Sequence, residues 1–346
     1  MSSVDTEGAP TAGTYIPAEY DKRLMVAAGR SSLELGSSIA ERLGVDLTDA
    51  GLKTFSDGEV YCRYRDSIRG ADLFIVQSTC RSDSQGLTVN DALMELMIMV
   101  HAAKHASAHR IIAVSPWYGY SRQDKKSAPR EPISARLIAD LLETAGIDRL
   151  VTMDLHAGQV QGFFSNPVDH MTAMPILTQY VQDQLGPVED LCIIAPDAGR
   201  VKLTRKFAQK VGAPYALLEK ERPAQQTAEI GYVIGKDKVR GKRAVIIDDM
   251  IDTGGTLAAG AQTVLEEGAD EVYAVATHGL FSGNAFETLA SSPLSGIVVT
   301  DTVPLPDGAP DLIRVLTSAD ILTDTVRKIF TDDSVSDIFQ GENQLF

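Results

Sequence analysis

The chain has 346 residues, of which 44% are hydrophobic and 6% aromatic, so it is long enough for two domains and favours an α/β fold over an all-β sandwich. Its net charge of −15 gives it no general attraction for nucleic acid or an anionic membrane, and we expect neither as a partner. No apolar stretch approaches the ~20 residues that span a bilayer, and the widely spaced Cys62, Cys80 and Cys192 indicate a reducing, cytoplasmic setting.

Strands and helices alternate along almost the whole chain. Residues 1–22 lack an apolar run and are expected to form a disordered arm rather than a secretory signal. Ser31 and Ser32 are expected to cap a first helix that ends at Leu43, before Gly44. Apolar runs predict strands at 24–28, 73–77, 110–115, 150–154, 191–195, 215–219, 244–247 and 272–277, and a short closing strand at 334–339. Helical patterns cover 91–104, 133–145, 174–184, 201–211, 256–267 and 319–330.

This alternation predicts βαβ units and mainly parallel sheets. The two halves are similar in length and rhythm, so we expect an α/β fold with two related domains, each a mainly parallel sheet flanked by helices. The expected N-terminal domain covers 23–170, with the tail at 333–340 packing back on it, and the C-terminal domain covers 171–332. Ligands of such sheets bind where strands end and helices begin, and chemistry is expected there.

The segment 244–256 carries the clearest chemical signal. Its sequence, Ala-Val-Ile-Ile-Asp-Asp-Met-Ile-Asp-Thr-Gly-Gly-Thr, runs from a strand through three acids into a glycine turn and a helix. Glycines let the backbone approach a ligand, and the N–H groups at a helix start, with nearby hydroxyls, suit a phosphate monoester. The expected phosphate donors are Thr253, Gly254, Gly255 and Thr256.

Asp248 and Asp249 of the same loop can accept hydrogen bonds from vicinal hydroxyls, and Asp252 is expected to belong to the same sugar-phosphate site. One loop thus offers phosphate donors and diol acceptors, and predicts a pocket for a 5-phosphorylated ribose. The alternative is that the acids merely cap the helix, which the length of the pattern disfavours. The sequence contains neither a Walker A string nor a G-x-G-x-x-G string, which argues against a P-loop or dinucleotide site.

The loop resembles the phosphoribosyl-diphosphate-binding motif of type I phosphoribosyltransferases. Four more segments are similar to motifs of the ribose-phosphate diphosphokinase family: Phe-Ser-Asp-Gly-Glu at 55–59, Tyr-Ser-Arg-Gln-Asp-Lys-Lys at 120–126, Asp-Leu-His-Ala-Gly-Gln-Val-Gln-Gly-Phe-Phe at 154–164 and Pro-Asp-Ala-Gly at 196–199. The resemblance runs from about 24 to 339. It implies two phosphoribosyltransferase-type domains. It also implies transfer of diphosphate from ATP to the anomeric hydroxyl of ribose 5-phosphate, giving AMP and phosphoribosyl diphosphate for nucleotide biosynthesis.

The resemblance also assigns roles to residues. Lys220 and Arg222, which follow the strand at 215–219, match the family's catalytic cations, and Arg222 also faces the ribose phosphate. His156 and Asp197 stand at strand ends and could hold magnesium, completed by ATP phosphates. A lone histidine is more often an ordinary loop residue, and the neighbouring motif reverses that preference here. The ATP-binding residues implied are Phe55, Asp57, Gly58, Glu59, Arg122 and Gln123.

The segment 55–59 reads as a hairpin tip, and in the family this loop comes from a neighbouring subunit, so the resemblance implies a homo-oligomer, a hexamer. The chain departs from the family pattern at Arg200, where many members have glycine, and in the extra residues at 81–91. Ser334 and Ser336 match part of an allosteric ADP or phosphate site. Two alternatives stay open: a phosphoribosyltransferase that consumes phosphoribosyl diphosphate, and a non-catalytic regulatory subunit.

Overall fold

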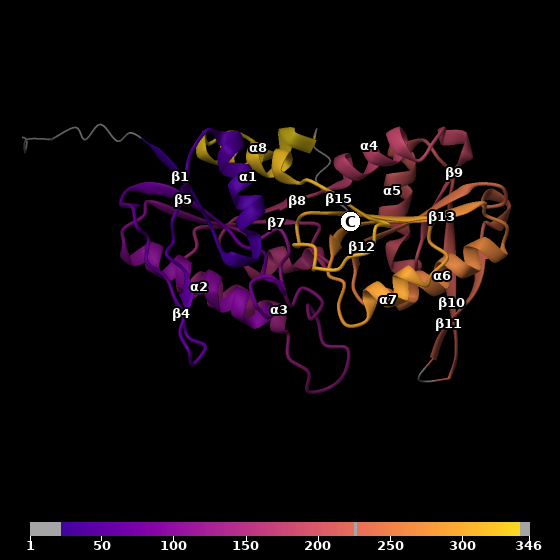
Figure 1. The fold of residues 1–346 in the computed structure, drawn as a ribbon, viewed down its shortest axis with the longest axis horizontal. Coiled ribbons are helices and arrows are strands. Elements are labelled where there is room, and N and C mark those ends of the chain that lie inside the picture. Colours follow the sequence, from indigo (N-terminus) through magenta and orange to yellow (C-terminus); the bar gives the residue numbers. More distant parts are fainter. Residues whose placement is uncertain (1–21, 225–226, 340–346) are drawn as a thin grey trace, which may run out of the picture.

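Two sheets lie side by side in the structure, a computed structural model that describes residues 22–224 and 227–339 (Figure 1). Helices α1, α8, α4 and α5 cover one face of this double layer, and α2, α3, α7 and α6 cover the other. The expected α/β architecture of two mainly parallel sheets flanked by helices is therefore confirmed. The arm expected at 1–22 lies almost wholly outside the described residues.

The first sheet has the strand order β2-β1-β5-β6-β7-β8, and all its neighbouring strands are parallel. Every residue of its central strand β5 is buried, as expected for a parallel strand with helices on both faces. The strands are β1 (Arg23–Ala28), β2 (Leu47–Thr48), β5 (Ala71–Val76), β6 (Arg110–Val114), β7 (Arg149–Met153) and β8 (Val168–Met171). The helices beside them are α1 (Leu33–Leu43), α2 (Val89–His105) and α3 (Ser134–Ala145).

The second sheet has the order β11-β10-β9-β12-β13-β14-β15, in which only β10 and β11 pair in antiparallel fashion among the described strands. Its strands are β9 (Leu191–Ala195), β10 (Tyr215–Ala224), β11 (Thr227–Ile234), β12 (Arg243–Ile251), β13 (Glu271–Gly279), β14 (Gly296–Thr300) and β15 (Ile313–Leu316). Its helices are α4 (Met174–Gln184), α5 (Val201–Val211), α6 (Gly255–Glu266), α7 (Ala285–Ala290) and α8 (Ala319–Phe330).

The smaller elements connect this framework. A separate hairpin joins β3 (Lys53–Thr54) to β4 (Val60–Tyr61). The short 3₁₀ helices are η1 (Arg30–Ser32), η2 (Gly158–Phe163), η3 (Val188–Asp190), η4 (Ala198–Arg200), η5 (Lys236–Lys238) and η6 (Val335–Phe339).

One hydrophobic core runs through both sheets. Phe74 and Val151 of the first sheet belong to the same buried cluster as Ile193 and Val275 of the second. Leu322 of α8 belongs to it too, because the last helix leaves the second sheet and packs on α1 (Figure 1). The two sheets are therefore held together by shared apolar burial, which keeps their strand ends in a fixed relation.

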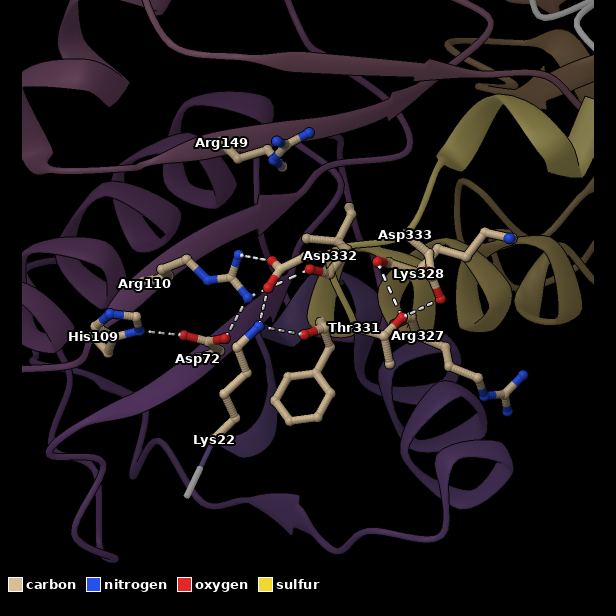
Figure 2. A network of polar contacts seen from close by, with 12 residues as sticks. Lys22, Asp72, His109, Arg110, Arg149, Arg327, Lys328, Thr331, Asp332 and Asp333 are labelled. Atoms are coloured by element: carbon tan, nitrogen blue, oxygen red, sulfur yellow. Dashed lines mark hydrogen bonds and ion pairs between the residues drawn. The ribbon is translucent and has the colours of Figure 1, made fainter. Parts of the chain in front are cut away.

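Charged residues fasten the end of α8 to the first sheet (Figure 2). Asp72 is fully buried at the start of β5, where His109 Nδ1 lies 2.8 Å from its Oδ1 and Arg110 Nη2 2.5 Å from its Oδ2. Arg110 Nη1 also contacts Asp332 Oδ1 at 2.9 Å, and Lys22 contacts Asp332 from the other side. We call this the Asp72 network (Lys22, Asp72, His109, Arg110 and Asp332).

Three details of the expected elements are wrong. The tail at 334–339 is not a strand: Asp332 adopts a φ of 58°, the chain folds back beside α8, and η6 forms there instead. The Ser31 and Ser32 hydroxyls do not cap α1, because they bond to the chain at Gln77 and Ser78 instead. The strand expected at 244–247 continues to Ile251.

The ranges of the two sheets agree with a division of the chain near residue 171, and we propose the domain bounds expected from the sequence. Val335 and Ile338 of η6 pack against the core that both sheets share. Within the described ranges, none of the helices combines the length and the apolar character that crossing a membrane requires.

Candidate functional site

The loop at 248–256 begins inside a strand. β13 runs beside β12 as far as Gly279, and its backbone pairs with Asp248, Met250 and Ile251. This pairing extends β12 through the acids, and α6 then begins at Gly255. Gly254 turns the chain with a φ of 77°, and a Cβ atom there would lie 2.8 Å from Leu289, so only glycine fits.

A cavity of ≈ 240 Å³ opens above this loop. Thr253, Gly254 and Thr256 line it on the side of the helix start, where backbone N–H groups lack intrahelical partners. Asp248 and Asp252 line the side of the strand. The cavity therefore combines possible anion donors with carboxylate acceptors.

The two adjacent acids face different spaces, because side chains alternate along a strand. Asp248 lines the first cavity, and its side chain is 33% exposed. Asp249, 5% exposed, lines a second cavity of ≈ 470 Å³. The cations around this second cavity are Arg122, Lys125, Arg200 and Lys202. These cations outnumber the two acids on the same wall, Asp124 and Asp249, so the second cavity suits an anionic group.

Arg200 bridges both acids. Its Nε lies 2.9 Å from Asp248 Oδ1, and its Nη2 lies 2.6 Å from Asp249 Oδ1. The same Nη2 is 2.9 Å from His156 Nδ1, and that nitrogen is also 2.8 Å from Asp249 Oδ2. Arg200 can reach these groups because β9 and β12 are parallel neighbours, so η4, which follows β9, lies beside the end of β12.

The surroundings of Asp248 and Asp249 shift the pKa values of these two acids in opposite directions. Burial and the neighbouring Asp249 raise the pKa of Asp248 well above its ordinary value. Burial would also raise the pKa of Asp249, but the hydrogen bond from His156 and the charge of Arg200 outweigh it and lower that pKa. Asp249 is therefore the firmly ionised partner, and the ionised form of Asp248 depends more on the cations near it.

The two candidate metal ligands come from different sheets and share a cavity. His156 follows β7, Asp197 follows β9, and both line the first cavity. Asp197 also accepts a hydrogen bond from the backbone N–H of Arg200 at 3.2 Å, which ties it to η4. Among the described residues no three acid, histidine or cysteine side chains form a ready metal cage.

Arg122 links the ATP-side motif to the sugar loop. Its Nη1 lies 2.6 Å from Asp252 Oδ2, and its side chain borders the first and second cavities. It also borders a third cavity of ≈ 330 Å³, which Gln123, Trp117 and Tyr120 line. Arg122 therefore stands where all three spaces meet.

Two sets of predicted residues lie elsewhere in this chain. Phe55, 44% exposed, sits in the turn between β3 and β4, with Asp57, Gly58 and Glu59 beside it, and none of the four lines the three cavities. Ser334 and Ser336 follow α8, where their hydroxyls contact each other at 2.7 Å.

The predicted catalytic cations lie on a strand rather than in a loop. β10 continues past Glu219 to Ala224 and pairs with β11, so the backbone at Lys220 lies opposite Ile230. The ladder is irregular at this point, with shifts in register on either side of Lys220 and Glu221. The side chains of Lys220 and Arg222 lie outside the described part of the structure, as do Gln225 and Gln226.

Sequence reasoning missed a buried polar network beneath His156. Asp154 has a φ of 38°, and its Oδ2 accepts hydrogen bonds from Thr277 Oγ1 at 2.6 Å and from the Ala173 N–H at 2.8 Å. Burial raises the pKa of Asp154 to about 6 and lowers that of His278 to about 4. His278 Nε2 lies 3.0 Å from Met153 O, so the network joins the ends of β7 and β13. No local sequence pattern predicts a contact between residues as far apart in the chain as Asp154 and Thr277.

Two family models match most of this chain. Residues 24–146 match a family model described as the N-terminal domain of ribose phosphate pyrophosphokinase. Residues 197–340 match one described as the phosphoribosyl synthetase-associated domain.

Whole proteins of the same kind are similar along their full length. The ribose-phosphate pyrophosphokinase of Caldanaerobacter subterraneus subsp. tengcongensis is 47% identical over 324 residues, covering 93% of this chain and 99% of the relative. That of Corynebacterium efficiens is 44% identical, with 94% and 98% covered. The crystal structure of phosphoribosylpyrophosphate synthetase from Mycobacterium smegmatis is 41% identical and superposes with a TM-score of 0.82, covering 90% of this chain and all (100%) of that one.

Proposed function

The chain belongs to the ribose-phosphate pyrophosphokinase family, and from that membership we propose which of its residues carry out the reaction. The enzyme transfers the diphosphate group of ATP to the anomeric hydroxyl of ribose 5-phosphate, and the products are 5-phosphoribosyl 1-diphosphate and AMP. The observation that carries the assignment of residues is the single cavity that Gly254 and Thr256, at the start of α6, line together with Asp248.

Ribose 5-phosphate binds in the first cavity. Its phosphate accepts hydrogen bonds from the backbone at 253–256 and from the Thr253 and Thr256 hydroxyls, and Arg222 adds a charge to it. Asp248 accepts from the ring hydroxyls, since it faces this cavity. Asp252 pairs with Arg122, and this contact helps to fix the turn. Asp249 lines the second cavity instead, beside His156.

A divalent metal ion, for which we propose magnesium, fits the donors present. Magnesium commonly binds one or two carboxylates and keeps waters or substrate phosphates as its other ligands, and no larger cage is found among the described residues. His156 and Asp197, which both line the first cavity, would hold it. When bound, it neutralises charge on the phosphate oxygens of ATP.

Asp249 orients His156 for this task. Because its Oδ2 lies 2.8 Å from His156 Nδ1, it favours the tautomer in which Nδ1 carries the proton and Nε2 presents its lone pair. The anomeric hydroxyl then attacks the β-phosphorus in line. Lys220 and Arg222 stabilise the charge that spreads over the transferred group, because such transfers need positioning and charge stabilisation more than covalent help.

ATP enters from the other side of Arg122. Its phosphates suit the second cavity with its four cations, and Gln123 and Arg122 contact the nucleotide toward the third cavity. The exposed Phe55 hairpin, with Asp57, Gly58 and Glu59, binds the adenine of a neighbouring subunit, which makes the enzyme a homo-oligomer, a hexamer. Ser334 and Ser336 belong to an allosteric site. The three free cysteines support a cytoplasmic location.

One assay tests the reaction. The purified chain is incubated with ATP, magnesium and ribose 5-phosphate, and AMP and phosphoribosyl diphosphate are measured. AMP that forms only when the sugar is present supports the proposal. Consumption of phosphoribosyl diphosphate with a free base would support a phosphoribosyltransferase instead, and no turnover under varied phosphate would support a regulatory subunit.

A further inference from the structure

Arg200 occupies the groups that the substrates need. Its guanidinium contacts Asp248 Oδ1 and Asp249 Oδ1, and the second oxygen of Asp249 faces His156 Nδ1. Three of the four oxygens of the acid pair are therefore engaged. Sugar hydroxyls that approach this pair meet oxygens that already have strong, charge-assisted partners.

In the absence of substrates, the acid pair stays ionised at both residues only beside a cation. Two adjacent carboxylates repel each other, and the burial of Asp249 removes much of the water that would screen them. A guanidinium has a rigid fork of donors, and here that fork spans both acids, Nε to one and Nη2 to the other. Arg200 therefore supplies inside the chain the charge that a divalent cation supplies when the site is loaded.

The two contacts of His156 Nδ1 require that nitrogen to be a donor and an acceptor at the same time. Its Nδ1 lies 2.8 Å from Asp249 Oδ2, to which it must donate, and 2.9 Å from Arg200 Nη2, from which it must accept. One nitrogen cannot do both. Donation to Asp249 leaves Nε2 with a lone pair for a metal, whereas acceptance from Arg200 puts the proton on Nε2. The tautomer of His156 whose Nε2 can bind a metal is therefore favoured only when Arg200 moves away from Nδ1.

We infer that Arg200 is a displaceable counter-ion that couples the two substrates: ribose 5-phosphate and a divalent cation take over the acid pair, and the released guanidinium binds a phosphate oxygen of ATP. Lys125 and Lys202 stand on the wall of the same cavity, so the released side chain joins cations that already face it. This inference rests on the proposal that Asp248 and Asp249 serve the sugar side. It makes Arg200 a binding residue for the polyphosphate and a competitor for the sugar.

The test is a calorimetric titration of Arg200→Ala in the presence of magnesium. The first ligand is ribose 5-phosphate, and the second is α,β-methylene-ATP, in which the bond that breaks is blocked. We expect the variant to bind the sugar alone about fivefold more tightly and the analogue, with sugar present, about tenfold more weakly. In the wild type the sugar should tighten analogue binding at least about fivefold, and in the variant this coupling should fall to about one.

Two further variants keep the result interpretable. Arg200→Lys retains the charge but has no fork, so it should bind the sugar like the alanine variant and keep part of the analogue affinity. Arg205→Ala, an exposed position on α5, should match the wild type in every titration. Sugar binding that is unchanged or weaker in Arg200→Ala overturns the inference. A wild type that binds no ribose 5-phosphate at all would instead overturn the proposed function of the acid pair.

Discussion

Two networks of carboxylates and cations lie at different strand ends of this molecule, and they contrast in what surrounds them. In the Asp72 network, Asp72 and Arg110 are direct neighbours across paired strands, and the carboxylate is fully buried with a partner on each oxygen. At the loop 248–256, the cation Arg200 comes from η4, and the acids border cavities of ≈ 240 and ≈ 470 Å³. Carboxylates and cations stabilise the fold in the Asp72 network, which no ligand can reach. At the loop 248–256, where a ligand can bind, the same kinds of group exchange partners.

The largest effect on stability should come from Arg110→Leu. The change leaves the buried Asp72 carboxylate with only His109 beside it, and removing one partner of a buried pair typically costs about 3–5 kcal/mol of the free energy of unfolding. Denaturant unfolding of the wild type and the variant measures this loss. Adding Asp72→Asn should recover part of it, and the turnover of folded enzyme should stay unchanged. A loss below about 1 kcal/mol would mean that water reaches Asp72 and that the contrast between the networks is smaller than we infer.

Lys220→Ala should lower turnover and leave stability unchanged, the opposite of Arg110→Leu. Loss of one preorganised charge donor in the transition state typically lowers turnover about 100- to 1000-fold, and we expect that loss without a change in the free energy of unfolding. Steady-state assays with magnesium-ATP and ribose 5-phosphate measure it. Lys236→Ala, which removes an exposed lysine near Glu267, is the matched control and should keep full activity. Near wild-type turnover in Lys220→Ala would remove this residue from the mechanism.

Local sequence patterns predicted the parts of the fold that short segments determine. β5, β9 and α6 lie close to where apolar periodicity and glycine turns put them, and the cavity opens at the predicted loop. The hairpin of β10 and β11 was not predicted, because the second half of β10 (Glu-Lys-Glu-Arg-Pro-Ala) is polar, pairs with β11 alone and lacks the apolar run that marks a buried strand. The tail at 334–339 was wrongly expected to be a strand, because the turn at Asp332, which decides its path, is not visible in the pattern of apolar residues.

The contacts that complete the site depend on strand order, which the sequence does not show. Arg200 reaches Asp248 because β9 and β12 are neighbours in the sheet, although the two residues are far apart in the chain. Asp154 and Thr277 meet because the ends of β7 and β13 face each other between the sheets. Sequence reasoning noticed Arg200 only as a departure from the family pattern, and only the fold explains what it does.

Acid should weaken the Asp72 network in a predictable direction. Burial alone would raise the pKa of Asp72, but the hydrogen bonds from Arg110 and His109 outweigh it and lower that pKa below its ordinary 3.8. Its stabilising contribution is therefore complete above about pH 4 and is lost as the pH falls through the lowered value. The difference in unfolding free energy between the wild type and Arg110→Leu should shrink as the pH falls below about 4. A constant difference would assign the effect of Arg110 to packing rather than charge.

The smallest effect should come from an exposed ion pair that ties α8 to α1 rather than to the first sheet. Arg42 of α1 lies 2.7 Å from Asp320 of α8, a distance similar to those in the Asp72 network, but the two side chains are 33% and 74% exposed. Exposed pairs of this kind contribute less than about 1 kcal/mol, because water solvates the separated charges almost as well. Asp320→Asn should therefore change the free energy of unfolding by less than that amount, as measured by the same denaturant titration. A loss as large as that of Arg110→Leu would show that the contact between α1 and α8, rather than the burial of Asp72, fastens the last helix to the first sheet.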